Sequence, residues 1–253
     1  MSKILITSGC SFSECISNWV ETWPKHLARL LPEYEHNSYA MGSQGNGLIS
    51  RGIIYGVTEA LKQYKAEDIL VGVMWSASNR MDFRCTNKND LEFVIDNVFD
   101  GWIENPTNFI DGAPKNWVIM NHHWRMKEAH VYYKMFFDFL GGSIYSLEHI
   151  LRVQWFLKQN NIKYFFTDFC DENIVDNKTL ERNDVEIMYL YNQIDRNHYL
   201  PVSSEETWCK ENSKFTHLWP NNWRTTPQHP MNAMHKEFTD MVIFPWLQSK
   251  GYV

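Results

Sequence analysis

Two serines near the N-terminus have the clearest capacity for nucleophilic chemistry. Ser11 and Ser13 follow the short apolar run at residues 4–6, in a small polar segment that also contains Gly9. The run predicts a buried strand, and the polar turn at its carboxyl end is where open α/β sheets place ligands. A serine there would face a substrate, with backbone N–H groups directed at developing negative charge. A plain strand-to-helix connection with a capping serine fits these residues equally well.

The segment Gly9-Cys10-Ser11-Phe12-Ser13 resembles the first block of the SGNH (GDSL) hydrolase family, Gly-Asp-Ser-Leu-Ser, with Cys10 in place of the aspartate. The resemblance implies that Ser11 is the nucleophile. Cys10 is a second candidate, ranked behind Ser11, because a helix N-terminus favours a thiolate. The family fold is also implied: a three-layer α/β/α sandwich around a mostly parallel, flavodoxin-like sheet.

The second and third blocks of that family supply donors for the oxyanion. The spacing in residues 37–42 is like that of the second block and implies that the Gly42 N–H is one donor, with Asn46 in the same loop as another. A glycine-rich turn and a helix cap are the alternatives for these two residues. The third block normally ends in asparagine, and here Ser76 takes that position, with Asn79 as a displaced candidate.

The last block supplies the catalytic base. His229-Pro230 matches its His-Pro pair, so the resemblance implies that His229 is the base, but the aspartate that normally precedes this pair is missing. A carboxylate from elsewhere, such as Asp168 or Glu205, or a backbone carbonyl would then orient the imidazole. His235 fits a second histidine seen in relatives, and we interpret it as structural.

The resemblance covers roughly the first 80 and the last 25 residues, in the right order. Trp75-Ser76 followed by Arg80 is similar to a divergent branch of SGNH-like proteins that is common in bacteriophages. That branch also has Gly-Cys-Ser-Phe at the start, Trp-Pro in the first helix and His-Pro near the end. The middle of the chain matches only as helix–strand units.

Composition narrows the function classes. The chain has 253 residues, a formal net charge of −6 and no run of basic residues, which argues against nucleic acid as a partner. Five irregularly spaced cysteines favour a reducing compartment. The apolar runs are too short for a signal peptide or a membrane span, so we expect a cytoplasmic protein, or a virion-associated one if it comes from a phage.

His122-His123 lacks a zinc-site context, and we expect no metal and no cofactor.

The elements that must position these residues alternate along the chain. Strand, turn and helix follow one another three times in the first third, which predicts a parallel sheet with helices on both faces. We expect strands at 4–6, 35–40, 69–75 and 163–167. We expect helices at 23–31, 48–65, 127–140, from 143 onward, near 184–195, near 204–212 and at 235–247. One domain spans 1–253, with an irregular aromatic-rich insertion at about 82–126.

The sequence therefore predicts a serine esterase of the SGNH type. The substrate we expect is a small-molecule or carbohydrate ester, an O-acetyl sugar first and a short acyl ester next. Two alternatives stay open: an inactive SGNH-fold protein that binds a glycan or belongs to a virion, and an O-acyltransferase that uses the same serine. Self-association of the chain is also left open.

Overall fold

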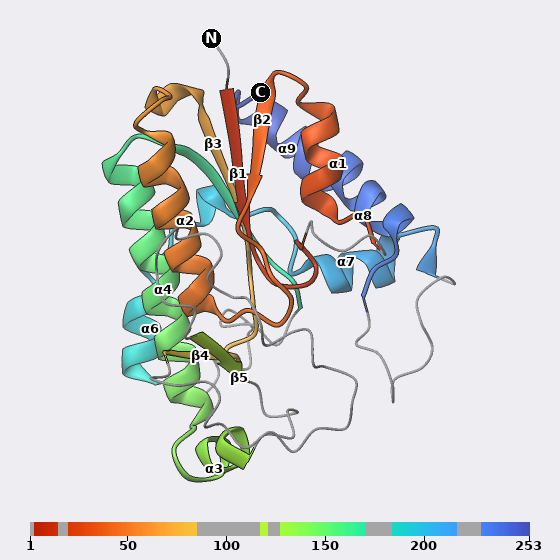
Figure 1. Ribbon diagram of the computed structural model, residues 1–253. Helices are drawn as coiled ribbons and strands as arrows, with labels where there is room; N and C mark the ends of the chain where they lie inside the picture. The colour runs from red at the N-terminus through yellow and green to blue at the C-terminus, as the bar shows by residue number, and fades with distance from the viewer. Residues whose placement is uncertain (1–2, 15–19, 85–116, 121–126, 171–183, 217–228) are drawn as a thin grey trace.

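The computed structural model describes residues 3–14, 20–84, 117–120, 127–170, 184–216 and 229–253. Its centre is a parallel sheet of four strands in the order β2-β1-β3-β6 (Figure 1). The strands are β1 (Lys3–Ser8), β2 (Tyr34–Ser38), β3 (Ile69–Trp75) and β6 (Lys163–Asp168). Ile4 of β1 is level with Glu35 of β2 and with Ile69 of β3. The expected α/β architecture with a mostly parallel sheet is confirmed.

One face of the sheet is covered by α2 (Asn46–Ala60), α4 (Phe139–Gln159) and α6 (Val185–Tyr191) (Figure 1). Ile4 and Ile6 of β1 point to this face, because alternate strand residues share a side. They pack in one apolar cluster with Ile53 of α2, Leu147 of α4 and Ile187 of α6.

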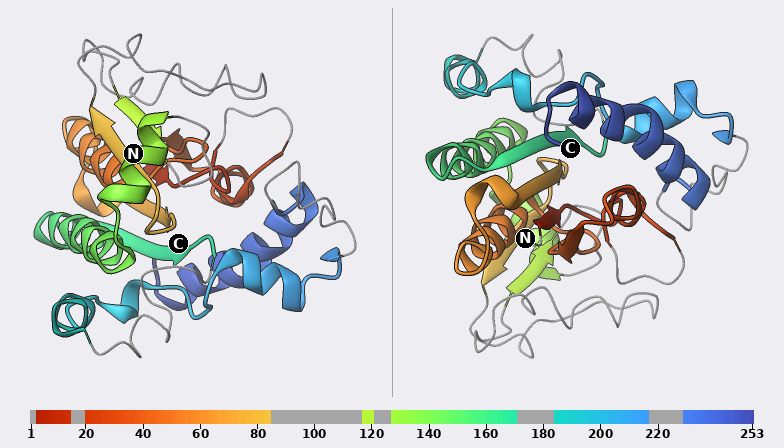
Figure 2. Two further views of the ribbon diagram at one scale, coloured as in Figure 1. Left: turned by 90° about the horizontal axis from the view of Figure 1, so that it is seen from below. Right: turned by 90° about the horizontal axis from the view of Figure 1, so that it is seen from above.

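The other face is covered by α1 (Trp23–Leu30), α7 (Glu205–Asn212), α8 (Asn232–Phe238) and α9 (Phe244–Ser249). Leu5, between the two isoleucines of β1, packs here with Trp23, Phe165 and Phe238. A π-helical turn, Thr239–Ile243, joins α8 to α9. The two views in Figure 2 show helices on both sides of the sheet, so the described chain has three layers.

The remaining described elements lie outside the main sheet. β4 (Met81–Arg84) pairs antiparallel with β5 (Trp117–Met120), and α3 (Lys127–Met135) precedes α4. Short 3-10 turns are formed by Ala66–Asp68 and Arg196–His198. Most of the predicted aromatic-rich insertion lies outside the described residues. None of the described helices combines the length and hydrophobicity needed to cross a bilayer.

The predicted helix boundary at Gly141-Gly142 is wrong. The structure ends α3 at Met135 and begins α4 at Phe139, so both glycines lie in the first turn of α4. The side chain of Asp138 caps α4 by accepting a hydrogen bond from the Gly141 N–H. The cap therefore begins the helix two residues before the glycines that were expected to separate two helices.

Candidate active site

Ser11 lies in a tight turn directly after β1. The turn is closed by the hydrogen bond from Ser13 N to Cys10 O, and Ser13 Oγ accepts a second from Trp23 Nε1 at 2.8 Å. A Cβ at Gly9 would lie 2.4 Å from Ser13 Oγ and 2.9 Å from the Met74 carbonyl oxygen, so this close approach requires glycine. Ser13 is fully buried in this structural role, whereas Ser11 is partly exposed.

His229 meets Ser11 from the other end of the chain. Its Nε2 lies 2.6 Å from Ser11 Oγ, within hydrogen-bond distance. Its ring also packs against the buried ring of Phe12, with centroids 4.9 Å apart. The structure therefore brings together the predicted nucleophile and the predicted base at the carboxyl edge of the sheet, in the geometry that a serine–histidine pair requires.

A carboxylate is bound to the predicted oxyanion donor. The Gly42 N–H donates a hydrogen bond to the side chain of Glu14, three residues after Ser11. Burial raises the pKa of Glu14, and this hydrogen bond partly offsets the effect. Glu14 was not singled out from the sequence, because only the fold brings the loop after β2 to the loop after β1.

Gln44 links these two loops by hydrogen bonds. Like Glu14, it was not predicted from the sequence. Its fully buried side-chain amide donates to Gly9 O at 3.3 Å and to Tyr39 O at 3.2 Å. The Met41 N–H adds a backbone hydrogen bond to Gly9 O. The relative position of Ser11 and Gly42 is therefore set by hydrogen bonds within the protein.

Asn46 has a structural position. Its Nδ2 donates to Ser76 O at 2.9 Å and to Ser146 Oγ at 3.0 Å, and its Oδ1 accepts from Ser76 N at 2.7 Å. Both amide hydrogens are engaged and the residue is fully buried. The predicted oxyanion role of Asn46 is therefore replaced by a role that ties α2 to β3 and α4.

Ser76 and Asn79 lie in the segment that follows β3. The Ser76 side chain is buried, and its Oγ accepts a hydrogen bond from Arg80 Nη1 at 3.0 Å. The Asn79 carbonyl oxygen accepts a hydrogen bond from the Tyr133 hydroxyl. The guanidinium of Arg80 stacks over Phe169, with its carbon 4.7 Å from the ring centroid. Arg80, a residue of the sequence motif for which no role was predicted, thus lies at the same edge of the sheet as Ser11.

One of the two carboxylates proposed to orient His229 has a different partner. Glu205 Oε1 lies 2.6 Å from Nδ1 of His235, and both side chains are fully buried. Burial raises the pKa of Glu205, and His235 opposes that shift. Glu205 is therefore the partner of His235, which takes the structural position expected for it. Asp168 ends β6, and its charge contributes to raising the pKa of the buried Tyr199.

Cys10 is fully buried, which leaves the partly exposed Ser11 as the accessible candidate nucleophile of this turn. Among the residues that the structure describes, no group of three or more His, Cys, Asp or Glu side chains could hold a metal ion. His122 and His123 lie outside those residues.

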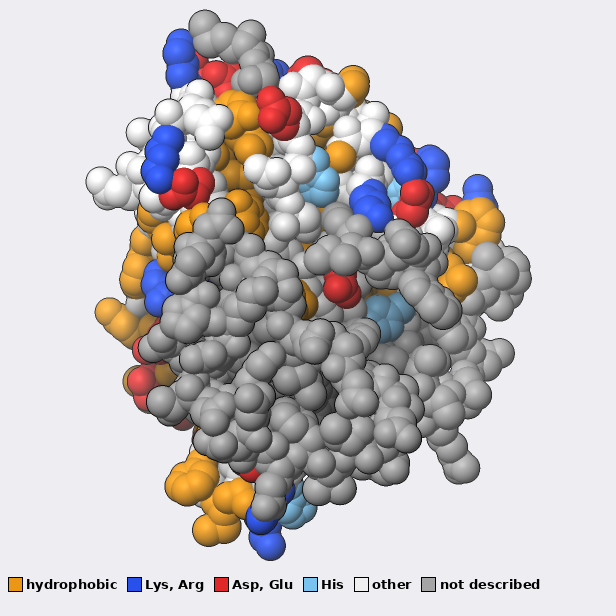
Figure 3. All heavy atoms as spheres, viewed as in Figure 1, with side chains coloured by type: hydrophobic (Ala, Val, Ile, Leu, Met, Phe, Trp, Pro, Cys, Tyr) orange, Lys and Arg blue, Asp and Glu red, His pale blue; other side chains and the backbone are white. Residues whose placement is uncertain are grey.

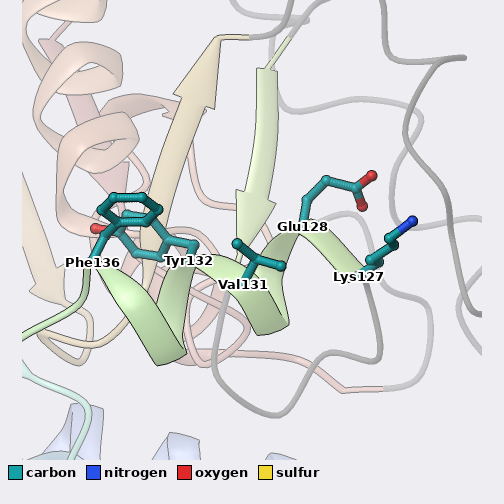
Figure 4. A pocket seen from close by; sticks show the side chains of 5 residues that line it. All are labelled: Lys127, Glu128, Val131, Tyr132 and Phe136. Carbon is teal, nitrogen blue, oxygen red and sulfur yellow. The ribbon is translucent and has the colours of Figure 1, made fainter.

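Exposed hydrophobic side chains gather around α3, at the lower end of the face shown in Figure 3. A shallow hollow there is lined by Val131, Tyr132 and Phe136, with Lys127 and Glu128 beside them (Figure 4). Neither Ser11 nor His229 lines this hollow, so it is separate from the candidate active site.

No protein-family model and no curated protein matches this sequence. A crystal structure of the protein YXIM from Bacillus subtilis is similar in structure, with a TM-score of 0.48 and 11% sequence identity. That similarity covers 99% of this chain, which spans 57% of the length of the other.

Proposed function

We propose that this protein is a serine hydrolase of the SGNH type that cleaves carboxylic esters. The observation that carries the proposal is the 2.6 Å contact between Ser11 Oγ and His229 Nε2. The strand order β2-β1-β3-β6 supports it, because the first four strands of a flavodoxin-like sheet have this order. The substrate classes we favour are O-acetylated carbohydrates and short acyl esters.

The proposed reaction has two stages. His229 Nε2 takes the Ser11 hydroxyl proton while Ser11 Oγ attacks the ester carbonyl carbon, which forms a tetrahedral intermediate. The C–O bond to the alcohol then breaks, and the imidazolium returns the proton to the departing oxygen. A water molecule, deprotonated by His229, next attacks the acyl-serine and releases the carboxylic acid and Ser11.

The backbone N–H of Ser11 is the first proposed donor to the oxyanion of the intermediate. The Gly42 N–H is the second, and it serves only after the Glu14 carboxylate leaves it. Loss of one oxyanion donor typically costs about 100- to 1,000-fold in kcat. Whether the Glu14 carboxylate occupies the Gly42 N–H should therefore affect kcat for the proposed reaction.

The second candidate function is ligand binding without catalysis. The specific observation that favours it is that the Gly42 N–H and both amide hydrogens of Asn46 are already engaged within the protein. A protein of this kind would bind its ligand in a saturable manner, and Ser11→Ala would not abolish the binding.

Hydrolysis of p-nitrophenyl acetate separates the two candidates. We expect Ser11→Ala and His229→Ala each to lower kcat/KM by at least about 100-fold. The matched control is Ser249→Ala, which removes an exposed hydroxyl from the end of α9. Equal rates for the wild type and Ser11→Ala would rule out Ser11 as the nucleophile and favour the binding function.

A further inference from the structure

Arg80 places a positive charge beside the candidate active site. Ser76 Oγ holds one end of its guanidinium, and the ring of Phe169 supports its face. Phe169 packs edge-on against Phe12 with centroids 5.1 Å apart, and Phe12 in turn contacts the ring of His229. The cation is thus connected to the dyad through two aromatic rings in direct contact.

The guanidinium keeps capacity for a ligand. Arg80 has five N–H donors, and among the described residues its side chain makes one hydrogen bond, to Ser76 Oγ. The residue is partly exposed. A guanidinium whose position is already fixed loses less entropy when it binds a planar anion with two parallel hydrogen bonds.

Nearby acidic groups leave this capacity in place. Asp82 is within electrostatic range of Arg80, but its two oxygens are fully buried and accept hydrogen bonds from Gly45 N and Leu48 N. Glu14 follows β1 and contacts Gly42 of the loop after β2, whereas Arg80 follows β3, on the other side of β1 in the sheet. The guanidinium of Arg80 lies toward β6, where it stacks on Phe169, and the carboxylate of Asp168 at the end of β6 is buried.

We propose that Arg80 determines specificity by binding an anionic group of the substrate, a carboxylate in the simplest case. The inference rests on the proposed ester hydrolysis for its substrate class: an ester with a negative charge on the side that faces β6. The binding of the anion itself does not depend on turnover, so it can be tested separately.

The binding test uses Ser11→Ala protein and 4-acetamidobenzoate, an amide analogue of an aryl acetate with a carboxylate on the ring. Titration calorimetry is compared with methyl 4-acetamidobenzoate, which lacks the charge. We expect Arg80→Gln in this background to weaken binding of the carboxylate about 10- to 100-fold and to change binding of the methyl ester less than about twofold. Arg80→Lys should recover part of the loss, because it keeps the charge but not the planar fork.

The matched control is Arg196→Gln, because Arg196 also stacks on an aromatic ring, that of Tyr191, but lies near Tyr199, which bridges β6 on the side away from β3. It should leave both affinities unchanged. Undetectable binding of the carboxylate to Ser11→Ala protein, or equal binding by the Arg80→Gln variant, overturns the proposal.

A turnover measurement separates this inference from the proposed function. The wild type and Arg80→Gln are compared on 4-acetoxybenzoate and on methyl 4-acetoxybenzoate, so that intrinsic reactivity cancels in the ratio of the two kcat/KM values. We expect Arg80→Gln to lower that ratio at least 10-fold, mainly through KM. Charge-dependent binding without Ser11-dependent hydrolysis would refute the esterase and support the anion site. Ser11-dependent hydrolysis with an unchanged ratio of the two kcat/KM values would support the esterase and refute the anion site.

Discussion

At the scale of single residues, the proposed catalytic pair lies among side chains that have structural roles. Ser11 and His229 face each other, whereas Ser13 and Gln44 fix the surrounding loops. Types and motifs in the sequence allowed Ser11 and His229 to be predicted. The roles of Asn46 and Glu205 could not be predicted, because a polar side chain's partner depends on which segments meet in three dimensions.

Glu14 provides a prediction at this scale. Its carboxylate accepts the hydrogen bond from Gly42 N–H that the oxyanion would need, so Glu14→Ala should raise kcat/KM for p-nitrophenyl acetate several-fold. The measurement is steady-state hydrolysis by wild type and variant. Glu33→Ala, which removes a half-exposed carboxylate near the amino end of β1, is the control. A slower Glu14→Ala enzyme with unchanged stability would show that Glu14 supports the site.

At the scale of elements, the beginning of α2 connects the sheet to the helical layer beside it. Asn46 at its first turn joins the end of β3 to α4, and Asp82 of β4 accepts hydrogen bonds from two N–H groups of the same turn. The sequence predicted β1, β3 and β6 well because buried parallel strands are nearly continuous apolar runs, whereas β4 and β5 were not predicted. It could not show these polar links, since they join segments distant in the chain.

We expect Asn46→Ala to lower the free energy of unfolding by about 2–4 kcal/mol, because three buried hydrogen bonds are lost and their partners stay buried. Ser146→Ala removes one of the three partners and should cost about 1 kcal/mol. Urea denaturation of both variants measures the difference. An Asn46→Ala protein with wild-type stability would contradict the structural role assigned to this residue.

Asp82 gives a prediction about pH. Burial raises the pKa of Asp82 to about 6 in the folded protein, despite two stabilising hydrogen bonds, whereas the carboxyl titrates near 3.8 in the unfolded chain. The folded state therefore binds the proton more tightly. This group's contribution to stability is greatest below pH 4, falls as the pH rises to 6 and is constant above.

Asp82→Asn removes this dependence while keeping the shape of the side chain. As the pH rises from 4 to 6, the free energy of unfolding of the wild type should fall relative to that of Asp82→Asn. Denaturation at several pH values measures this difference. Other titrating groups are shared by both proteins and cancel in the difference. A difference that does not change with pH would contradict the raised pKa of Asp82.

The boundary between α3 and α4 shows why local signals mislead at this scale. Gly141-Gly142 has the composition of a helix end, yet a Cβ at Gly142 would lie 2.8 Å from the Ser78 carbonyl oxygen. The second glycine is thus required by the close approach of α4 to the loop after β3. A sequence alone does not distinguish a glycine that ends a helix from one that allows tight packing.

At the scale of the whole molecule, the candidate site joins the two ends of the chain. Ser11 follows the first strand, and His229 immediately precedes the C-terminal helices that pack on the sheet. The layered α/β arrangement follows from alternating strand and helix patterns, so it was predictable from the sequence. The identity of an acid partner for His229 could not be predicted, because no aspartate precedes His229-Pro230 in the motif.

The packing of the C-terminal helices on the sheet should therefore contribute strongly to the free energy of unfolding. Phe238 is fully buried in the core of this face and packs against Trp208 with centroids 5.4 Å apart. Phe238→Ala should lower the free energy of unfolding by about 3–5 kcal/mol through the cavity that it leaves. Met241→Ala, at a position 61% exposed, should change it by less than about 0.5 kcal/mol. Thermal denaturation compares the two, and similar melting temperatures would contradict the packing described for α8.

The most direct test of the serine–histidine assignment is covalent labelling with a fluorophosphonate probe, followed by intact-mass measurement and peptide mapping. We predict one adduct per chain, located on Ser11, absent in Ser11→Ala and formed at least about 100-fold more slowly in His229→Ala. A folded wild-type protein that takes up no probe, or takes it up on another residue, would contradict the claim that His229 activates Ser11.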